Sequence, residues 1–198
     1  MSVTPSLDTN CGRYFRYRDF IECGDTFEAL RPDNFPKSEQ TYLALEILAR
    51  EILDPVIEEF GAIQLTYGLS CNALSLKIES QISPPHDQHA SYELNSRGKQ
   101  ICPRGGAAVD FVCENKSSLV VAKWIAENCV FDRLYFYGDD RPIHVSAGPE
   151  ENRLIVLMQK ARVPKRRIPR KISIEKFCAL NIDHELITKC TNLWSVGA

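Results

Sequence analysis

Two histidines and one aspartate stand at positions where side chains of these types can bind a metal ion. His144 lies in an apolar run directly after the carboxylate-rich turn 138–142. Asp110 lies inside the apolar run 107–112, where an ionised carboxylate is costly to bury unless it is paired or metal-bound. His89 precedes the glycine-containing approach to that run. Two imidazoles and a carboxylate suit a catalytic zinc ion, whose fourth position is left for water.

Purely structural roles for these residues are the alternative. A histidine on an apolar strand is typical of a protein core, and Asp110 has the pattern of a structural acid satisfied by neighbouring donors. Spacing alone does not separate the two interpretations. A bound zinc ion would lower the pKa of its water to about 7 and polarise a carbonyl group.

The elements that must position these residues are predicted from hydrophobic periodicity. A helix is expected from Ser38 to Gly61, with Pro55 kinking or ending it, and a second helix over 118–128. Strands are expected at 63–67, 107–112, 134–137, 143–145 and 154–158, and the third and fourth form a hairpin. The expected fold is α+β, with a small, mainly antiparallel central sheet flanked by helices and with a C-terminal extension.

The composition of the chain changes at Lys160. Seven of the twelve residues from Lys160 to Lys171 are basic, and Pro164 and Pro169 interrupt the run. We therefore divide the chain into a domain of residues 1–159 and a basic linker with a helical C-terminal extension over residues 160–198. Such a run is typical of a solvated linker, and the alternative is contact with the phosphates of a nucleic acid.

The overall composition is typical of a globular protein and excludes several classes. Of 198 residues, 44% are hydrophobic and 25% charged, and the formal net charge of −2 gives no global attraction to nucleic acid or membrane. No run approaches the roughly 18 apolar residues of a membrane span. The N-terminal residues lack the pattern of a secretory signal, so we expect a cytoplasmic protein whose eight cysteines are reduced thiols.

Four sequence blocks, taken together, resemble one known family. They are Leu53-Asp54-Pro55-Val56 with Phe60-Gly61, Leu65-Thr66-Tyr67-Gly68 with Ala73-Leu74, Gly106-Ala107-Ala108-Val109-Asp110-Phe111, and Ile143-His144-Val145-Ser146 with Gly148. The third block resembles the second half of an H-x-x-G-x-A-x-D motif. The fourth resembles an "IHVD-G" block that carries the last zinc ligand. The chain from Phe15 to Gly148 is thus similar to the zinc D-alanyl-D-alanine carboxypeptidase family, which shares its core fold with the hedgehog signalling domain.

This resemblance implies which residues hold the zinc ion. Asp110 and His144 fall directly on ligand positions of the family. The family histidine stands seven residues before the aspartate, where this chain has a proline. The similarity of Gln88-His89 to the family's "SQH" favours His89, with an insertion before the strand of Asp110, and surface insertions add little loop-closure cost. His86 and Cys102 remain alternatives, because an imidazole or a thiolate can bind zinc.

The resemblance also assigns the residues that contact substrate and water. The family's substrate-binding arginine falls on Ser70, and the usual position of its general base falls on Arg141. Asp140, with Asp139 beside it, is therefore expected to accept a proton from the attacking water. Tyr67, Ser70 and Arg141 are expected to contact the substrate.

Two functions follow from these expectations. The first is a zinc-dependent hydrolase of the D-alanyl-D-alanine carboxypeptidase type, which cleaves an amide bond in a peptide, such as one derived from peptidoglycan. The second is a catalytically altered intracellular binding domain on the same scaffold, associated with nucleic acid through residues 160–171. A peptide or other amide-containing substrate is the favoured partner, and no membrane partner is expected.

Overall fold

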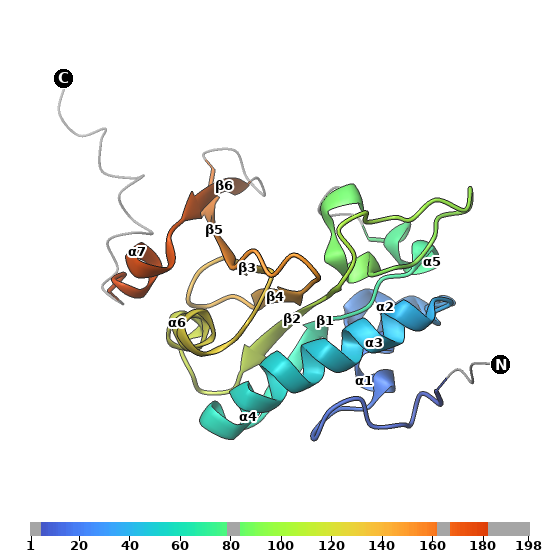
Figure 1. Cartoon of the computed structure of the whole chain (residues 1–198), viewed down its shortest axis with the longest axis horizontal. Coiled ribbons are helices and arrows are strands. Elements are labelled where there is room, and N and C mark those ends of the chain that lie inside the picture. The colour runs from blue at the N-terminus through green and yellow to red at the C-terminus, as the bar shows by residue number, and fades with distance from the viewer. Residues whose placement is uncertain (1–4, 79–83, 162–166, 182–198) are drawn as a thin grey trace.

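The computed structural model describes residues 5–78, 84–161 and 167–181 and confirms the α+β class (Figure 1). Its sheet has the strand order β1-β2-β4-β3-β5-β6. The strands are β1 (Ile63–Tyr67), β2 (Ala107–Cys113), β3 (Arg133–Phe136), β4 (Ile143–Ala147), β5 (Leu154–Lys160) and β6 (Arg167–Ile172). The β3–β5 pair is parallel and the other neighbours are antiparallel, so the sheet is mainly antiparallel as expected.

The two expected helices are present, and the structure adds short helices before residue 37 and at Asn72–Ser75 that the sequence did not predict. The α-helices are α1 (Tyr17–Ile21), α2 (Asp25–Leu30), α3 (Glu39–Leu48), α4 (Asp54–Phe60), α5 (Asn72–Ser75), α6 (Ser118–Asn128) and α7 (Ile174–Cys178). The π-helical turn η1 (Ala49–Leu53) joins α3 to α4, and Pro55 lies in the first turn of α4, where a missing N–H is tolerated. Among the described residues, no helix is both long enough and apolar enough to cross a membrane.

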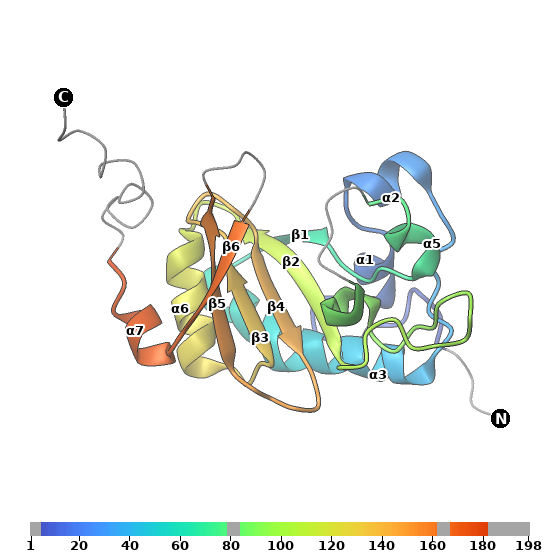
Figure 2. The same ribbon diagram turned by 90° about the horizontal axis from the view of Figure 1, so that it is seen from above.

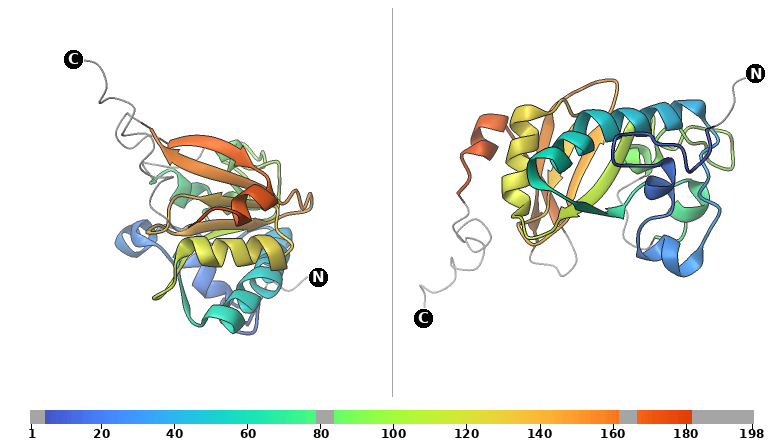
Figure 3. Two further views of the ribbon diagram at one scale, coloured as in Figure 1. Left: turned by 90° about the vertical axis from the view of Figure 1, so that its left-hand side faces the viewer. Right: turned by 90° about the horizontal axis from the view of Figure 1, so that it is seen from below.

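Helices α3, α4 and α6 form a layer against one face of the sheet (Figures 2 and 3). Val109 and Phe111 of β2 and Val145 of β4 are completely buried in the core that this layer shares with the sheet. Side chains alternate between the two faces of a strand, so the residues between them point the other way. Asp110 and His144 therefore lie on the face opposite these helices.

A row of four residues crosses the sheet on that opposite face. Asp110 of β2 pairs with His144 of β4, and His144 pairs with Tyr135 of β3. On the other side, Tyr67 of β1 is the partner of Asp110, because an irregularity after Leu65 shifts the register. An irregularity of this kind changes the direction in which the following side chain points. The strand register thus brings one carboxylate, one imidazole and two phenols into line.

The basic segment differs from the linker that the sequence predicts. Residues 167–172 form β6, which pairs with β5 from Ile155↔Ile172 to Lys160↔Arg167. Charged residues and proline are typical of a strand at the edge of a sheet, because they discourage further pairing. The structure does not describe residues 162–166 and 182–198, where the rest of the predicted linker and extension lies.

Part of the predicted extension also packs onto the domain. Phe177 of α7 is completely buried, and its ring meets that of Phe136 at a centroid distance of 5.7 Å. Residues on both sides of residue 160 therefore contribute to one apolar core. The seven described cysteines are free, and most are buried among apolar neighbours, where a thiol packs as a small hydrophobic group.

Candidate metal centre

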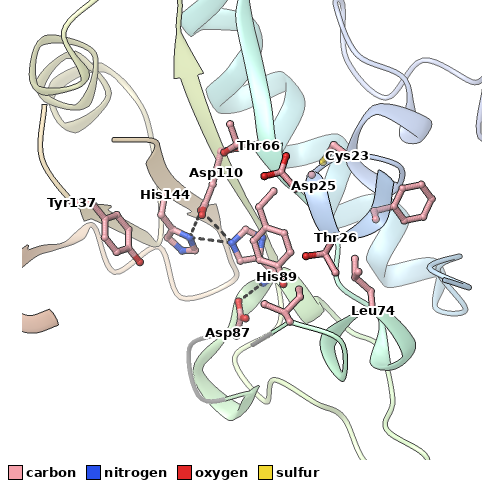
Figure 4. Close-up of a pocket in the computed structure, with 14 residues that line it drawn as sticks. Cys23, Asp25, Thr26, Thr66, Leu74, Asp87, His89, Asp110, Tyr137 and His144 are labelled. Atoms are coloured by element: carbon pink, nitrogen blue, oxygen red, sulfur yellow. Dashed lines mark hydrogen bonds and ion pairs between the residues drawn. The ribbon is translucent and has the colours of Figure 1, made fainter. Parts of the chain in front are cut away.

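The side chains of His89, Asp110 and His144 point toward one another (Figure 4). Asp110 Oδ1 lies 2.8 Å from His144 Nδ1 and 3.2 Å from His89 Nε2. His89 Nε2 lies 3.2 Å from His144 Nδ1. Both histidines are only 2% exposed, whereas the Asp110 side chain is 26% exposed, so two buried donor atoms and one partly buried donor atom face one another.

These three distances fit the ligand shell of a small divalent cation. Four ligands at zinc–ligand bonds of about 2.05 Å lie about 3.3 Å from one another in a tetrahedron. The observed separations of 3.2 and 3.2 Å are close to the edges of one triangular face of such a tetrahedron, and the 2.8 Å separation, which is a hydrogen-bond distance, is about 0.5 Å shorter. The donor set of two imidazoles and one carboxylate is also one that zinc accepts. The cluster can therefore hold a metal ion, and its donors fit zinc.

Neighbouring groups determine how the two imidazoles are oriented. His89 Nδ1 lies 2.8 Å from the carbonyl oxygen of Gly68, which only accepts, so Nδ1 carries the proton. In the neutral ring, the lone pair of Nε2 then points at the cluster. The ring of His144 is stacked on Tyr135 at a centroid distance of 4.7 Å and an interplanar angle of 15°. Supporting contacts of this kind fix tautomer and ring orientation in metal sites.

The electrostatics of the cluster favour an ionised carboxylate. Burial by itself would raise the pKa of Asp110, but the positive charge that His89 carries when both of its ring nitrogens are protonated, together with hydrogen bonds from both imidazoles, outweighs it and lowers that pKa. Burial acts to lower the pKa of His89, whereas the negative charges of Asp87 and Asp110 act to raise it, and the net direction is upward. Asp110 is therefore an anionic donor to the site.

A buried polar network holds the short helix η3 (Gln88–Ala90) that carries His89. Gln88 Nε2 donates to Asp132 Oδ2 at 2.8 Å and to the carbonyl oxygen of Gly105 at 3.0 Å. Gln88 Oε1 accepts from the hydroxyl group of Ser146 at 2.8 Å. Gln88 and Asp132 are at most 1% exposed. The residue next to His89 is thereby tied to the sheet that carries the other two members of the cluster.

The cluster opens into a cavity of about 300 Å³. Residues of α2, β1, β2 and β4 and of the segment around η3 line it, and Figure 4 shows Asp25 and Thr26 on the wall opposite His144. Asp25 and Asp87 bring two further carboxylates, and Tyr137 lies beyond His144. The cluster therefore borders a cavity that is partly open to solvent.

The structure separates the residues expected at the substrate. Tyr67 lines the cavity, and its ring lies against His89 at a centroid distance of 4.0 Å. Ser70 is 1% exposed and does not line the cavity, although its backbone N–H donates to the His89 carbonyl oxygen. Arg141 is exposed and also lies outside the cavity lining, because it belongs to the turn beyond Tyr137.

Neither aspartate expected as general base lines the cavity. Asp139 Oδ1 accepts hydrogen bonds from the Ser117 hydroxyl group and the Leu119 N–H, so it caps the start of α6. The side chain of Asp140 is 74% exposed. Their positions follow from the turn between β3 and β4, which points these carboxylates toward α6 and solvent.

The two alternative ligands lie apart from the cluster. His86 is exposed, and its carbonyl oxygen accepts from Arg104. Cys102 is completely buried in a small apolar group with Ala90 and Ile101. Of the three candidates, His89 is the one that the structure brings to Asp110 and His144.

Sequence reasoning missed Asp25, Asp87, Tyr135 and Tyr137 as neighbours of the cluster. Asp87 stands two residues before His89, and Tyr135 lies on a predicted strand, so the sequence could have identified both as neighbours of the cluster. The contribution of Asp25 depends on α2, a helix that the sequence analysis did not predict.

Together, the fold and the site define an α+β protein with a buried His-Asp-His cluster that can hold a metal ion. A scan against protein-family models, a search of curated proteins and a search of solved structures each found no match. The argument for function therefore depends on the geometry of the site and on the sequence blocks described above.

Proposed function

We propose that this chain is a zinc-dependent hydrolase of the D-alanyl-D-alanine carboxypeptidase type, which cleaves an amide bond in a peptide. The observation that carries the proposal is the convergence of three donor atoms, at separations of 2.8 to 3.2 Å, beside a cavity. The resemblance of the blocks around Tyr67, Asp110 and His144 to that family supports it. A peptidoglycan-derived peptide is the substrate to test first.

The residues of the chain have distinct tasks in this proposal. Zinc, when bound, supplies a Lewis acid that lowers the pKa of water to about 7 and polarises a carbonyl group. His89, Asp110 and His144 would hold the ion, with Nε2, Oδ1 and Nδ1 as the donor atoms that face one another. Hydrolysis breaks the amide C–N bond, and the water supplies OH to the carbonyl carbon and a proton to the leaving nitrogen.

The proton acceptor in this proposal is Asp140 or Asp139. A base must come within about 3 Å of the attacking water, so the turn 138–141 must move toward the cavity when substrate binds. The variants Asp140→Asn and Asp139→Asn test this role separately. Loss of kcat in one of them, with its zinc content retained, would identify the base.

A second candidate is a domain that holds the metal ion and binds a partner without cleaving it. The observation that favours it is the engagement of Asp139 with the start of α6, which leaves no described base beside the cluster except Asp25 and Asp87. The exposed residues Arg170 and Lys171 of β6 would then contact nucleic acid. Retention on nucleic acid would fall steeply with salt in that case.

The test combines metal analysis with hydrolysis of a defined peptide. Wild-type protein should contain one equivalent of zinc, and His89→Ala and His144→Ala should each lose it. His86→Ala is the matched control, because this exposed histidine lies outside the cluster and its variant should retain zinc. The wild type should cleave a peptidoglycan stem pentapeptide, as monitored by mass spectrometry, and neither cluster variant should cleave it. Zinc binding without cleavage of any amide would favour the second candidate.

A further inference from the structure

A basic surface lies on the same face of the sheet as the metal centre. The pairs of Tyr135 with Val156 and of Val156 with Lys171 continue the row of the cluster across β5 to β6. Residues paired across neighbouring strands share a face, and so does every second residue along a strand. Lys160 and Arg167, which pair with each other, therefore point to this face together with Lys171. We call these three residues the basic face.

No described acid pairs with the basic face, and no described helix covers it. Strands β3, β5 and β6 contain no acidic residue. Lys160 and Lys171 are exposed and form no ion pair with a described residue. Figure 2 shows α3 and α6 behind the sheet and no described helix in front of β3, β5 and β6. Within the described part of the chain, the basic face is therefore open to a partner of opposite charge.

Arg167 is held in place while one edge of its guanidinium group stays unpaired. Its Nη1 donates to the carbonyl oxygens of Tyr137 and Met158, each at 3.0 Å. Its Nε and Nη2 donate to no described residue. These two nitrogens form an edge of the guanidinium group that can bind a carboxylate through two parallel hydrogen bonds. Because Nη1 already fixes the side chain, little rotamer freedom is lost when the other edge binds an anion.

Tyr137 connects the basic face with the cavity. The guanidinium carbon of Arg167 lies 5.8 Å from the centre of the Tyr137 ring. Tyr137 also lines the cavity, on the far side of His144 from His89 (Figure 4). The described lining residues include neither lysine nor arginine. An anionic part of a substrate therefore finds a cationic contact where the substrate extends past Tyr137, at Arg167.

The make-up of this surface favours an acidic peptide over a nucleic acid. Met158 and Pro169, which pair with each other, point to the same face and offer apolar contact to a peptide chain. Proteins that bind single-stranded nucleic acid without sequence preference stack the bases on aromatic rings. The rings of Tyr135 and Tyr137 each have one face covered already, by an imidazole and a guanidinium group. The fork of an arginine, in contrast, matches a single carboxylate.

We infer that the basic face binds an acidic segment of the peptide substrate, with the Nε–Nη2 edge of Arg167 taking one of its carboxylates while the bond to be cleaved lies at the metal centre. This inference rests on the proposed function and narrows its substrates to peptides with acidic side chains outside the cleaved bond. Arg167 lies outside the cavity lining, so it determines specificity and takes no part in the chemical step.

The test measures binding without turnover, with two peptides that differ only in charge. The probes are acetyl-(Glu-Ala)4-amide and its neutral counterpart acetyl-(Gln-Ala)4-amide, each titrated into the full chain in a calorimeter at low ionic strength. We expect the glutamate peptide to bind about tenfold more tightly, because hydrogen bonds between charged groups are the stronger ones. This preference should shrink as salt is raised, because salt screens exposed charges.

Two variants and a matched control connect this preference to named residues. Arg167→Gln should weaken binding of the glutamate peptide about tenfold, with circular dichroism showing that the wild-type fold is kept. Lys171→Gln breaks no described contact, so it tests the basic face independently of folding, and it should weaken binding about threefold. Arg170→Gln is the control. Arg170 pairs with Leu157 of the core and so points to the opposite face, and its variant should change binding less than about twofold.

The outcomes separate this inference from the proposed function. Equal affinity for the two peptides, or a loss in Arg170→Gln as large as that in Lys171→Gln, would overturn the inference and leave the hydrolase intact. A single-stranded DNA oligonucleotide that binds more tightly than the glutamate peptide, and that loses affinity in Arg167→Gln and Lys171→Gln, would overturn it in favour of a nucleic acid. A preference for the glutamate peptide without hydrolysis of any peptide would support the acidic partner and overturn the hydrolase.

Discussion

The substitution Gln88→Leu should weaken both the fold and the metal centre. Gln88 makes three buried hydrogen bonds, to Asp132, to the carbonyl oxygen of Gly105 and from Ser146. The bond to a charged carboxylate contributes about 1.5–3 kcal/mol and each neutral bond about 0.5–1.5 kcal/mol. Leucine keeps the approximate volume but removes all three. We therefore expect the free energy of unfolding to fall by about 4 kcal/mol.

This loss should appear as a large shift in thermal stability. For a chain of this length, 1 kcal/mol corresponds to about 2–4 °C in Tm, so Tm should fall by roughly 8–16 °C. Because Gln88 holds the short helix of His89, zinc affinity should also fall about 10- to 100-fold. Denaturant titration of zinc-free protein measures the first effect, and competition with a chelator measures the second.

The matched control is Gln40→Leu, the same replacement at an exposed position of α3. Its free energy of unfolding should change by no more than about 0.5 kcal/mol. A loss below about 1 kcal/mol in Gln88→Leu would refute the role of the network in stability. A large loss of stability with unchanged zinc affinity would refute its role in positioning His89.

Three further predictions concern the metal, the turn before β4 and the buried thiols. Zinc at 100 times its Kd should raise the free energy of unfolding of the wild type by about 2.7 kcal/mol and should not raise that of Asp110→Asn. Denaturant titration with and without a chelator measures this difference. Equal stabilisation of both proteins would exclude Asp110 as a ligand. Asp139→Asn should lower the free energy of unfolding by about 1 kcal/mol, because it weakens the cap of α6. Asp140→Asn, at an exposed side chain, should change it by less than about 0.5 kcal/mol. Equal losses in the two variants would contradict the role of Asp139 as the helix cap. Burial raises the pKa of Cys11 to about 12 and that of Cys129 to about 11, above the unfolded value of 9.0. The free energy of unfolding should keep its full value below pH 9. Above pH 9 it should fall by up to about 1.4 kcal/mol per pH unit for each thiol, because only the unfolded state loses the proton. A free energy of unfolding that stays constant from pH 8 to 10.5 would contradict this prediction.

Local patterns were sufficient to predict most of the elements that position the site. The apolar runs around Asp110 and His144 predict two strands, and the structure has β2 and β4 there. The helix at 118–128 is likewise present as α6. These predictions succeed because strand and helix periodicities depend on residues that are near in sequence.

Local patterns failed where long-range pairing decided the outcome. The basic residues of 167–172 resemble a solvated linker in sequence, yet they form the edge strand β6 beside β5. The aspartates 139 and 140 stand close to His144 in sequence, but the turn directs them toward α6 and solvent. Sequence proximity does not show which way a turn points its side chains.

The sequence by itself determined the donor types, the α+β class and the strands that carry Asp110 and His144. Only the tertiary structure decided that His89, rather than His86 or Cys102, meets these two residues. The physical reason is that the mostly irregular segment between η3 and β2 leaves the position of η3 undetermined until Gln88 bonds to groups far along the chain. The charge of the cavity was likewise decided by folding, because Asp25 and Asp87 come from separate segments that only packing brings together.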